Sequence, residues 1–420
     1  MASVTSSHSA NPPEIRRVGP PAFQRSLILA GVLLLSRLPY LTHPTPVHPD
    51  EAEFLAALGF PERYPVHPPG YPLWVALGSA LHGLGVGPYV SYAAWSLLAS
   101  IAAPVLLYGL LRRHVDDTLA ALTAASLGAC PLTWFLSVTT LTYLAASALA
   151  LAVFWLCTTA AMDRSARIAC LAAALLAPSL SLRPDLLLWL GPAFLYACLR
   201  AGWRSAWSAV AVVAAGAIAS SLWSRWLYDD DTGKAAMAHT RDVLLNTSVF
   251  RLGLYDGLLR SAVKLAGFLA WSLGPALIAF LAVPRIRRAM APDRCEKDLH
   301  RMLWLWAGPM MLFFLTVHQS EAGHMLLLPP LYALLALLLH TRLPPAAGRR
   351  VALLIAVLSA AQFTVYPWSE KSSGIKRLLD AKIAFVSGRG LMRIDRRAEI
   401  HRMGDTWRTR AHDQEKGSGE

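Results

Sequence analysis

Residues 88–111 read PYVSYAAWSLLASIAAPVLLYGLL, an uncharged run that decides the fold class. A helix needs roughly 20 consecutive apolar residues to cross a hydrocarbon core of ~30 Å. Only helices and closed barrels satisfy every backbone N–H and C=O group in lipid. Similar apolar runs recur along most of the 420 residues, so the sequence predicts an all-α polytopic membrane protein.

The composition agrees with this prediction. Hydrophobic residues make up 55% of the chain and charged residues 15%, whereas about a quarter of a soluble domain is charged. The net charge of +13 would suggest nucleic acid in a soluble protein. Here the basic residues flank apolar runs, so topology accounts for them and no nucleic-acid partner is expected. The five cysteines show neither metal-ligand spacing nor a disulfide framework.

We predict about eleven transmembrane helices, at 24–41, 88–111, 118–136, 138–160, 166–182, 184–199, 204–226, 259–283, 301–317, 324–341 and 350–366. One further stretch, 70–86, is short, carries His82 and is broken at its end by Gly83, Gly85 and Gly87. If this stretch lies at the outer interface, the basic loops all face the cytoplasm, as the positive-inside rule requires. If it crosses, every later loop changes side. We therefore predict an interfacial segment.

Three regions follow from this topology. Residues 1–23 form a polar, disordered tail, 24–366 the transmembrane catalytic domain, and 367–420 a small basic tail. The first apolar run lacks a cleavage pattern, so we expect a retained anchor in the cell membrane. Residues 42–87 form the first outer loop, on the extracytoplasmic face.

The first outer loop gathers carboxylates where a helix leaves the membrane. His48-Pro49-Asp50-Glu51 is followed by Glu53, and residues 51–58 are predicted to be helical with Asp50 as N-cap. Adjacent carboxylates at an interface are poorly solvated, and one of them could act as a general base. The alternative is a capped interfacial helix with exposed acids.

A proline-rich element follows these acids. Residues 67–74 read HPPGYPLW, from His67 through Tyr71. Prolines and glycine predict a rigid turn, followed by an aromatic interfacial segment. An aromatic anchor at the membrane surface is the alternative. The specific feature is the order: membrane helix, Asp-Glu pair, short helix, His-Pro-Pro-Gly, interfacial helix.

That order resembles the C-type glycosyltransferase (GT-C) superfamily of multi-pass enzymes that use polyprenyl-phosphate sugars. The likeness is to protein O-mannosyltransferases and to bacterial relatives that modify lipid A or lipopolysaccharide core. It is strongest over 24–200 and weaker over 318–345. The resemblance implies a GT-C-like fold, a polyprenyl-phosphate sugar and membrane lipid as partners, Asp50 as catalytic base and Glu51 beside it.

One departure concerns metal. Many of these relatives carry a second acid in the next outer loop, which helps to hold a divalent ion. Here that region reads SVTTLTY over 137–143, and no acid occurs between Asp117 and Asp163. A divalent cation needs several oxygen ligands. We therefore expect no metal and no cofactor, although Glu51, Glu53 and Glu321 leave a cation open.

Two further polar turns are predicted at the outer surface. The fork of Arg183, in Arg183-Pro184-Asp185, suits a carrier phosphate; a snorkelling arginine with a local Arg–Asp pair is the alternative. His318 and His324 are also assigned to the donor phosphate, with a solvated hairpin as the alternative. The residues expected to position substrate are His48, Glu53, His67, Tyr71, Tyr143 and Glu321.

The expected function is transfer of a sugar, with inversion, to a lipid, glycan or protein acceptor on the outer face. A transporter or flippase is one alternative, which intramembrane charges would favour. Lys264 is the clear charge well inside a predicted helix. A non-catalytic glycolipid-binding relative is the other alternative, and the missing second acid keeps it open.

Overall fold

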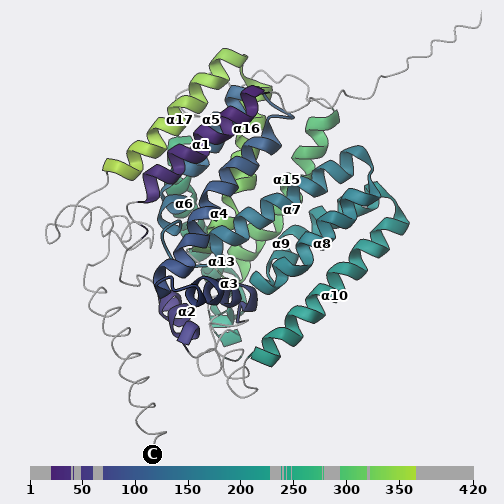
Figure 1. Ribbon diagram of the computed structural model, residues 1–420. Coiled ribbons are helices and arrows are strands. Elements are labelled where there is room, and N and C mark those ends of the chain that lie inside the picture. The colour runs from purple at the N-terminus through teal and green to yellow at the C-terminus, as the bar shows by residue number, and fades with distance from the viewer. Residues whose placement is uncertain are drawn as a thin grey trace, which may run out of the picture.

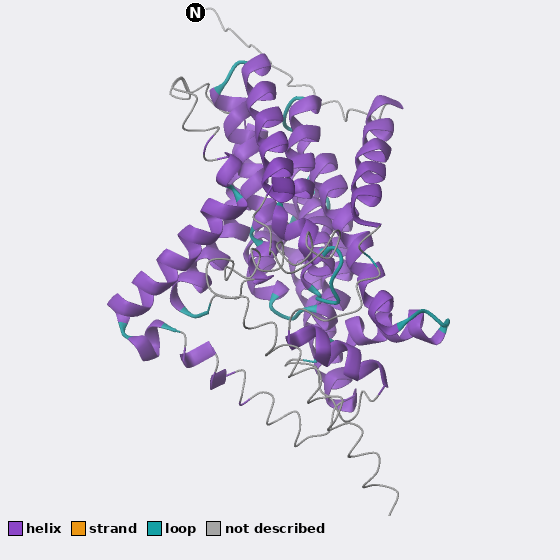
Figure 2. Cartoon of the chain, turned by 90° about the vertical axis from the view of Figure 1, so that its left-hand side faces the viewer, coloured by secondary structure: helices purple, strands orange, loops and turns teal. Residues whose placement is uncertain are grey.

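The computed structural model describes residues 20–38, 41, 49–59, 70–227, 238, 241–242, 244–246, 248–276, 278, 294–318 and 322–365. Within these ranges the regular elements are helices, and none is a strand (Figure 2). They are α1 (Pro20–Arg37), α2 (Pro49–Gly59), α3 (Pro72–Gly83), α4 (Pro88–Leu111), α5 (Asp117–Ala129), α6 (Pro131–Leu136), α7 (Tyr143–Asp163), α8 (Ala166–Leu182), α9 (Leu186–Ala201), α10 (Trp203–Leu227), α12 (Val249–Leu252), α13 (Leu254–Ser272), α15 (Arg294–Thr316), the 3-10 helix η2 (Ala322–Leu326), α16 (Leu328–Arg342) and α17 (Pro345–Val365).

The long helices form a bundle, with the short helices α2 and α3 at one end (Figure 1). The core lies between α4, α7, α15 and α16, where large side chains are fully buried. Among these, Phe154 of α7 and Trp306 of α15 pack with ring centroids 5.0 Å apart. The helix α10 stands at one edge of the bundle beside α8 and α9.

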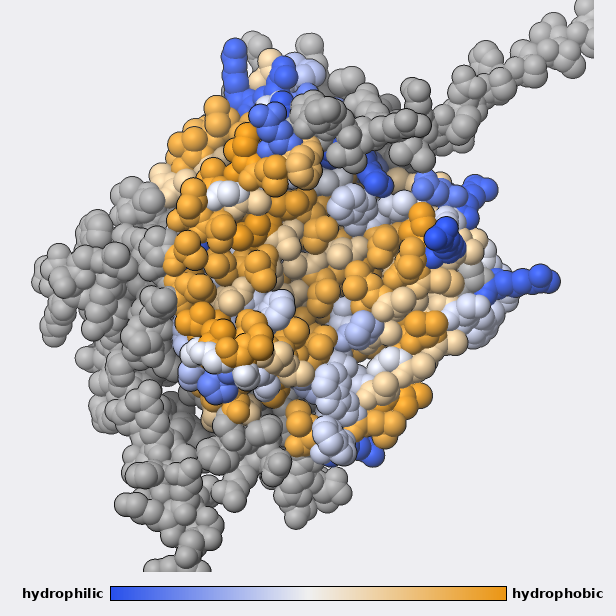
Figure 3. Space-filling view, viewed as in Figure 1, coloured by the Kyte–Doolittle hydropathy of each residue, from blue (hydrophilic) through white to orange (hydrophobic). Residues whose placement is uncertain are grey.

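The surface of the bundle suits lipid. Figure 3 shows apolar side chains over most of one face, with hydrophilic ones gathered toward its upper and right-hand rims. Large apolar residues such as Leu98, Leu171 and Ile218 are at least half exposed. Soluble monomers rarely expose large contiguous apolar patches. In the described part, Pro88–Leu111, Tyr143–Asp163 and Ala206–Leu227 are long and apolar enough to cross a bilayer. The protein is an all-α polytopic membrane protein, as predicted.

Several predicted boundaries are correct. The helices α4 and α8 occupy the predicted ranges 88–111 and 166–182. The predicted interfacial stretch 70–86 contains α3, whose 12 residues span about 18 Å and are too short to cross the bilayer. The total of eleven spans stays a prediction. Residues 1–19 and 366–420 lie outside the described part, and α1 begins at Pro20, four residues before the predicted helix.

The predicted bounds of two neighbouring helices, 118–136 and 138–160, are wrong. Residues 118–136 were expected as one helix, but α5 ends at Ala129 and α6 begins at Pro131. Proline lacks an N–H and clashes with the preceding turn, so the helix breaks there. The helix α7 begins at Tyr143, later than the expected 138. Residues 137–142, hereafter the α6–α7 connection, are therefore not helical, and they are buried.

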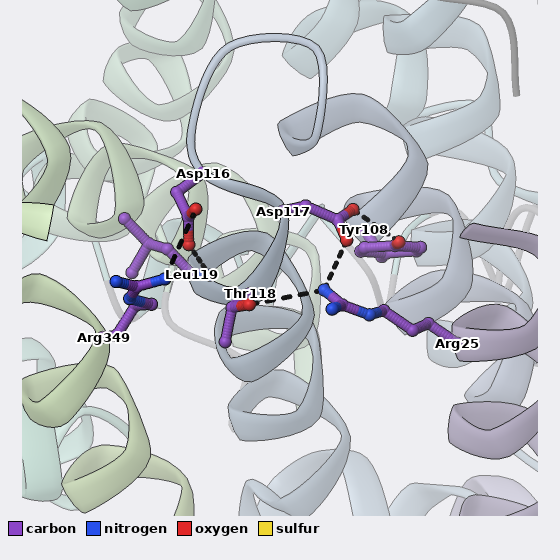
Figure 4. A network of polar contacts seen from close by, with 7 residues as sticks. All are labelled: Arg25, Tyr108, Asp116, Asp117, Thr118, Leu119 and Arg349. Carbon is purple, nitrogen blue, oxygen red and sulfur yellow. Dashed lines mark hydrogen bonds and ion pairs between the residues drawn. The ribbon is translucent and has the colours of Figure 1, made fainter. Parts of the chain in front are cut away.

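The end of the bundle away from α2 and α3 is held by charged side chains (Figure 4). Arg25 of α1 forms an ion pair with Asp117, which also accepts a hydrogen bond from the Tyr108 hydroxyl at 2.7 Å. Asp116 lies 3.9 Å from the Nη1 of Arg349 in α17. These contacts join α1, α4, α5 and α17 at this end.

Candidate active site

The helix α2 carries the acid pair. It begins at Pro49, where proline suits the first helical position. Asp50 and Glu51 follow in the first turn, where carboxylates complement the helix dipole. The expectation that Asp50 is the N-cap is wrong, because the helix begins one residue earlier than Asp50. The side chain of Asp50 lies outside the described part, and so do His48 and His67.

The Glu51 side chain is buried, with 0% exposure. Its Oε2 accepts a hydrogen bond from the Thr140 N–H at 3.1 Å and lies 3.5 Å from the Thr140 hydroxyl. A buried carboxylate requires such donors. Glu51 thereby fastens α2 to the α6–α7 connection. Glu53, two residues on, is half-buried.

The helix α3 contacts the same threonine from the other side. Trp74 is fully buried, and its indole N–H donates to the Thr140 carbonyl at 2.8 Å. Its ring stacks on Tyr92 of α4, with centroids 5.6 Å apart. Gly78 permits this packing, because a Cβ there would lie 2.2 Å from the Tyr92 ring. The backbone N–H and the backbone carbonyl of Thr140 thus both bind side chains of the predicted first outer loop.

Tyr71 is held in a strained conformation immediately before α3. Its φ of 45° and ψ of 53° are left-handed, after Gly70 with φ of 91°. A non-glycine residue in this region costs of the order of 1–3 kcal/mol, and such strain clusters at functional sites. The Tyr71 ring packs against Phe54 of α2 at 5.8 Å and lies beneath the Arg183 guanidinium at 5.6 Å.

Arg183 joins three separate segments. It lies between α8 and α9 with 9% exposure, and its Nε and Nη2 donate to the Asp185 carboxylate at 3.0 and 2.8 Å. Its Nη1 lies 3.4 Å from the Thr142 hydroxyl, and its guanidinium stacks on Tyr143 at 4.4 Å. Burial disfavours its charge, but Asp185, Tyr71 and Tyr143 outweigh burial and raise the pKa of Arg183 well above its usual value.

The structure therefore brings together three residues predicted from separate motifs: Arg183, Tyr71 and Tyr143. It also contains the local Arg–Asp pair that was the alternative for Arg183. Asp185 takes one N–H from Nε and one from Nη2, so the edge of the guanidinium formed by Nη1 and the second Nη2 N–H is the one a phosphate could bind without displacing that carboxylate.

The helix η2 lies near the same region. His318, two residues after the end of α15, is half-buried. The helix η2 packs on α6, α7 and α16, and Thr133 of α6 donates to the Met325 sulfur at 3.5 Å. Glu321 and the side chain of His324 lie outside the described part. Of the two predicted donor histidines, His324 thus lies in η2, which packs on α6 next to the α6–α7 connection.

The sequence analysis missed Thr140 and Thr142. The Thr140 backbone N–H and carbonyl bind Glu51 and Trp74, and the Thr142 hydroxyl accepts from Arg183. The one available signal was the density of Ser and Thr directly after a proline-broken helix. That signal suggests polar contacts but does not identify their partners.

No group of three His, Cys, Asp or Glu side chains within the described residues is arranged to hold a metal ion. Glu321 and the side chain of His324 lie outside those residues. The metal-free mechanism therefore stays a prediction.

No protein-family model matches the chain, and no curated protein matches it in sequence. Two solved structures of ArnT from Cupriavidus metallidurans are similar in fold. The apo structure is 15% identical with a TM-score of 0.55, and the match covers 88% of this chain and 70% of ArnT. The structure bound to undecaprenyl phosphate is 16% identical with a TM-score of 0.55, over 91% and 73% of the two chains.

This likeness defines the class of fold. The chain has the polytopic, all-helical fold of ArnT, which is the GT-C-like fold expected from the sequence. At 15–16% identity the likeness concerns the fold alone.

Proposed function

We propose that this protein transfers a sugar from a polyprenyl-phosphate carrier to a hydroxyl acceptor at the outer face of the cell membrane. The observation that carries the proposal is the fold shared with an ArnT structure that holds undecaprenyl phosphate. The clamped α2 supports it, because Asp50 directly precedes a glutamate fixed on Thr140.

In the proposed reaction, the Asp50 carboxylate, the acceptor hydroxyl and the carrier phosphate each have one role. The Asp50 carboxylate removes the proton of the acceptor hydroxyl, and the resulting oxygen attacks the anomeric carbon of the sugar. The bond from that carbon to the carrier phosphate oxygen breaks, and the lipid phosphate leaves with its electron pair. A single in-line displacement inverts the anomeric configuration. Glu51 does not touch substrate; its buried contact with Thr140 orients the first turn of α2.

The donor phosphate is assigned to the region of Arg183. A phosphate beside a guanidinium gains charge-assisted hydrogen bonds, and Nη1 is the nitrogen not engaged by Asp185. Tyr71 and Tyr143 stack on the guanidinium and hold its plane. His318 and His324 are assigned to the same phosphate, and Glu53, His48, His67 and Glu321 to the acceptor.

The test uses the full chain in nanodiscs with a panel of undecaprenyl-phosphate sugars and a membrane lipid extract as acceptor. We expect one member of the panel to be consumed, with release of undecaprenyl phosphate measured by thin-layer chromatography. The variant Asp50→Asn should bind that donor without consuming it. Tight donor binding without consumption by the unmodified chain would instead favour the glycolipid-binding alternative. Movement of intact donor between leaflets would favour the flippase alternative.

A further inference from the structure

A buried arginine at the end of α1 is not explained by the site described above. Arg37 is 0% exposed. Its Nη1 donates to the Leu33 carbonyl at 3.0 Å and the Ser36 hydroxyl at 3.1 Å, and its Nη2 donates to the Gly128 carbonyl at 2.5 Å. No carboxylate of the described residues forms an ion pair with it, and its Nε is buried without a partner. Burying a cation is costly where the described residues supply no counter-ion, so the contacts to carbonyl groups must offset that cost.

The main partner of Arg37 is the end of α5. Gly128 is the second-last residue of that helix, where carbonyls lack partners in the helix and carry the negative end of its dipole. The guanidinium satisfies this carbonyl immediately before Pro131 breaks the chain direction. The two helices are also in close contact, because a Cβ at Gly128 would lie 2.7 Å from a Leu33 methyl group.

The residue that binds on the other side of α6 is Glu51, 14 positions after Arg37 in the chain. Glu51 binds the Thr140 N–H in the α6–α7 connection. Arg37 thus holds the carbonyl before α6, and Glu51 holds the amide after it. The cation is matched to a carbonyl and the anion to an N–H. Two buried charges, one on α1 and one on α2, therefore hold the backbone on either side of α6.

We propose that Arg37 is a positioning residue: by holding the end of α5 beside α6, it acts with Glu51 to keep α2, which carries Asp50, in register with the α6–α7 connection. This inference rests on the proposed function for its catalytic consequence, but not for its structural one. A misplacement of about 1 Å can cost on the order of 10²-fold in rate. Loss of Arg37 should therefore lower kcat and leave the KM for the donor nearly unchanged.

The protein supplies a matched control on the same pair of helices. Arg25 also joins α1 to α5, through Asp117, but it lies 12 residues earlier, about 18 Å away along α1. The variants Arg37→Met and Arg25→Met each remove one arginine contact between these helices. Only the first removes the anchor beside α6. The variant Arg37→Lys keeps a charge that can reach one carbonyl and should restore part of the loss.

The experiment measures kcat, KM and hydrogen exchange of the α2 amides (residues 49–59) for all three variants in nanodiscs. We expect Arg37→Met to lose about 10²-fold in kcat and to exchange faster in α2, Arg37→Lys to fall between it and the unmodified chain, and Arg25→Met to change neither quantity. Unchanged α2 exchange in Arg37→Met overturns the proposal, as does an equal loss of kcat in Arg25→Met.

Two outcomes separate this inference from the proposed function. If the unmodified chain consumes no donor, the proposed function fails, while the exchange measurement still tests the anchor. If neither Arg37→Met nor Arg37→Lys folds, while Arg25→Met does, Arg37 serves stability in general and the positioning role is contradicted.

Discussion

Replacing Glu51 tests whether α2 is held by the contact with Thr140. In Glu51→Ala, a charge-assisted hydrogen bond worth about 1.5–3 kcal/mol is lost, and the buried Thr140 N–H is left without this acceptor. We therefore expect unfolding free energy to fall by about 3 kcal/mol. Glu51→Gln keeps an oxygen acceptor for that N–H and loses only the charge, so its cost should be about 1 kcal/mol.

The assay is unfolding by SDS in mixed micelles, followed by tryptophan fluorescence. Thr139→Val is the control, because the Thr139 hydroxyl donates to the Leu136 carbonyl at the end of α6, at 3.0 Å, and not to a residue of α2. Hydrogen exchange of the α2 amides is measured on the same proteins. Thr139→Val should accelerate this exchange far less than Glu51→Ala does. An unfolding free energy for Glu51→Ala within about 0.5 kcal/mol of the unmodified chain, below the usual cost of losing such a bond, would refute the clamp.

Three other outcomes are expected. Gly78→Ala should destabilise the protein by about 1–3 kcal/mol through overpacking, because its Cβ would lie 2.2 Å from the Tyr92 ring. Unfolding measurements check this, and Gly83→Ala is the control because a Cβ there would meet open space. Transfer should survive a chelator, because no acid occurs in the α6–α7 connection; a loss that a divalent cation restores would reverse this. Cysteines introduced at Leu84 and His114 should label from opposite faces of the membrane, since the 24 residues of α4 span about 36 Å; labelling from one face would mean that the topology is wrong.

The sequence predicted the elements whose signal is local. The helix α4 is an uninterrupted apolar run between Gly87 and Arg112, and its bounds were predicted correctly. Pro131 interrupts residues 118–136, but the apolar character of that run led to the prediction of a single helix. Proline inside a membrane run is often tolerated, since neighbouring groups can satisfy the freed backbone. Here Pro104 stays within α4 while Pro131 starts a new helix.

The candidate site could be predicted only in part. The acid pair and the proline-rich turn were identified because they are contiguous. The contact between Glu51 and Thr140 joins residues 89 positions apart, so no local pattern reveals it. Arg37 was overlooked for the same reason: it stands in an apolar run as an ordinary flanking arginine, and its burial depends on α5. Residues that bridge distant segments require the tertiary structure.

The central claim is tested most directly by the turnover of Asp50→Asn. The substitution keeps the size of the side chain, and Asp50 lies in the first turn of α2, where loss of the charge costs only about 0.3–1 kcal/mol through the helix dipole. Donor binding and unfolding should therefore change little. A general base contributes typically ~10²–10⁴-fold, so sugar transfer from the polyprenyl-phosphate donor should fall by that factor. Near-normal transfer by a folded Asp50→Asn protein would contradict the account.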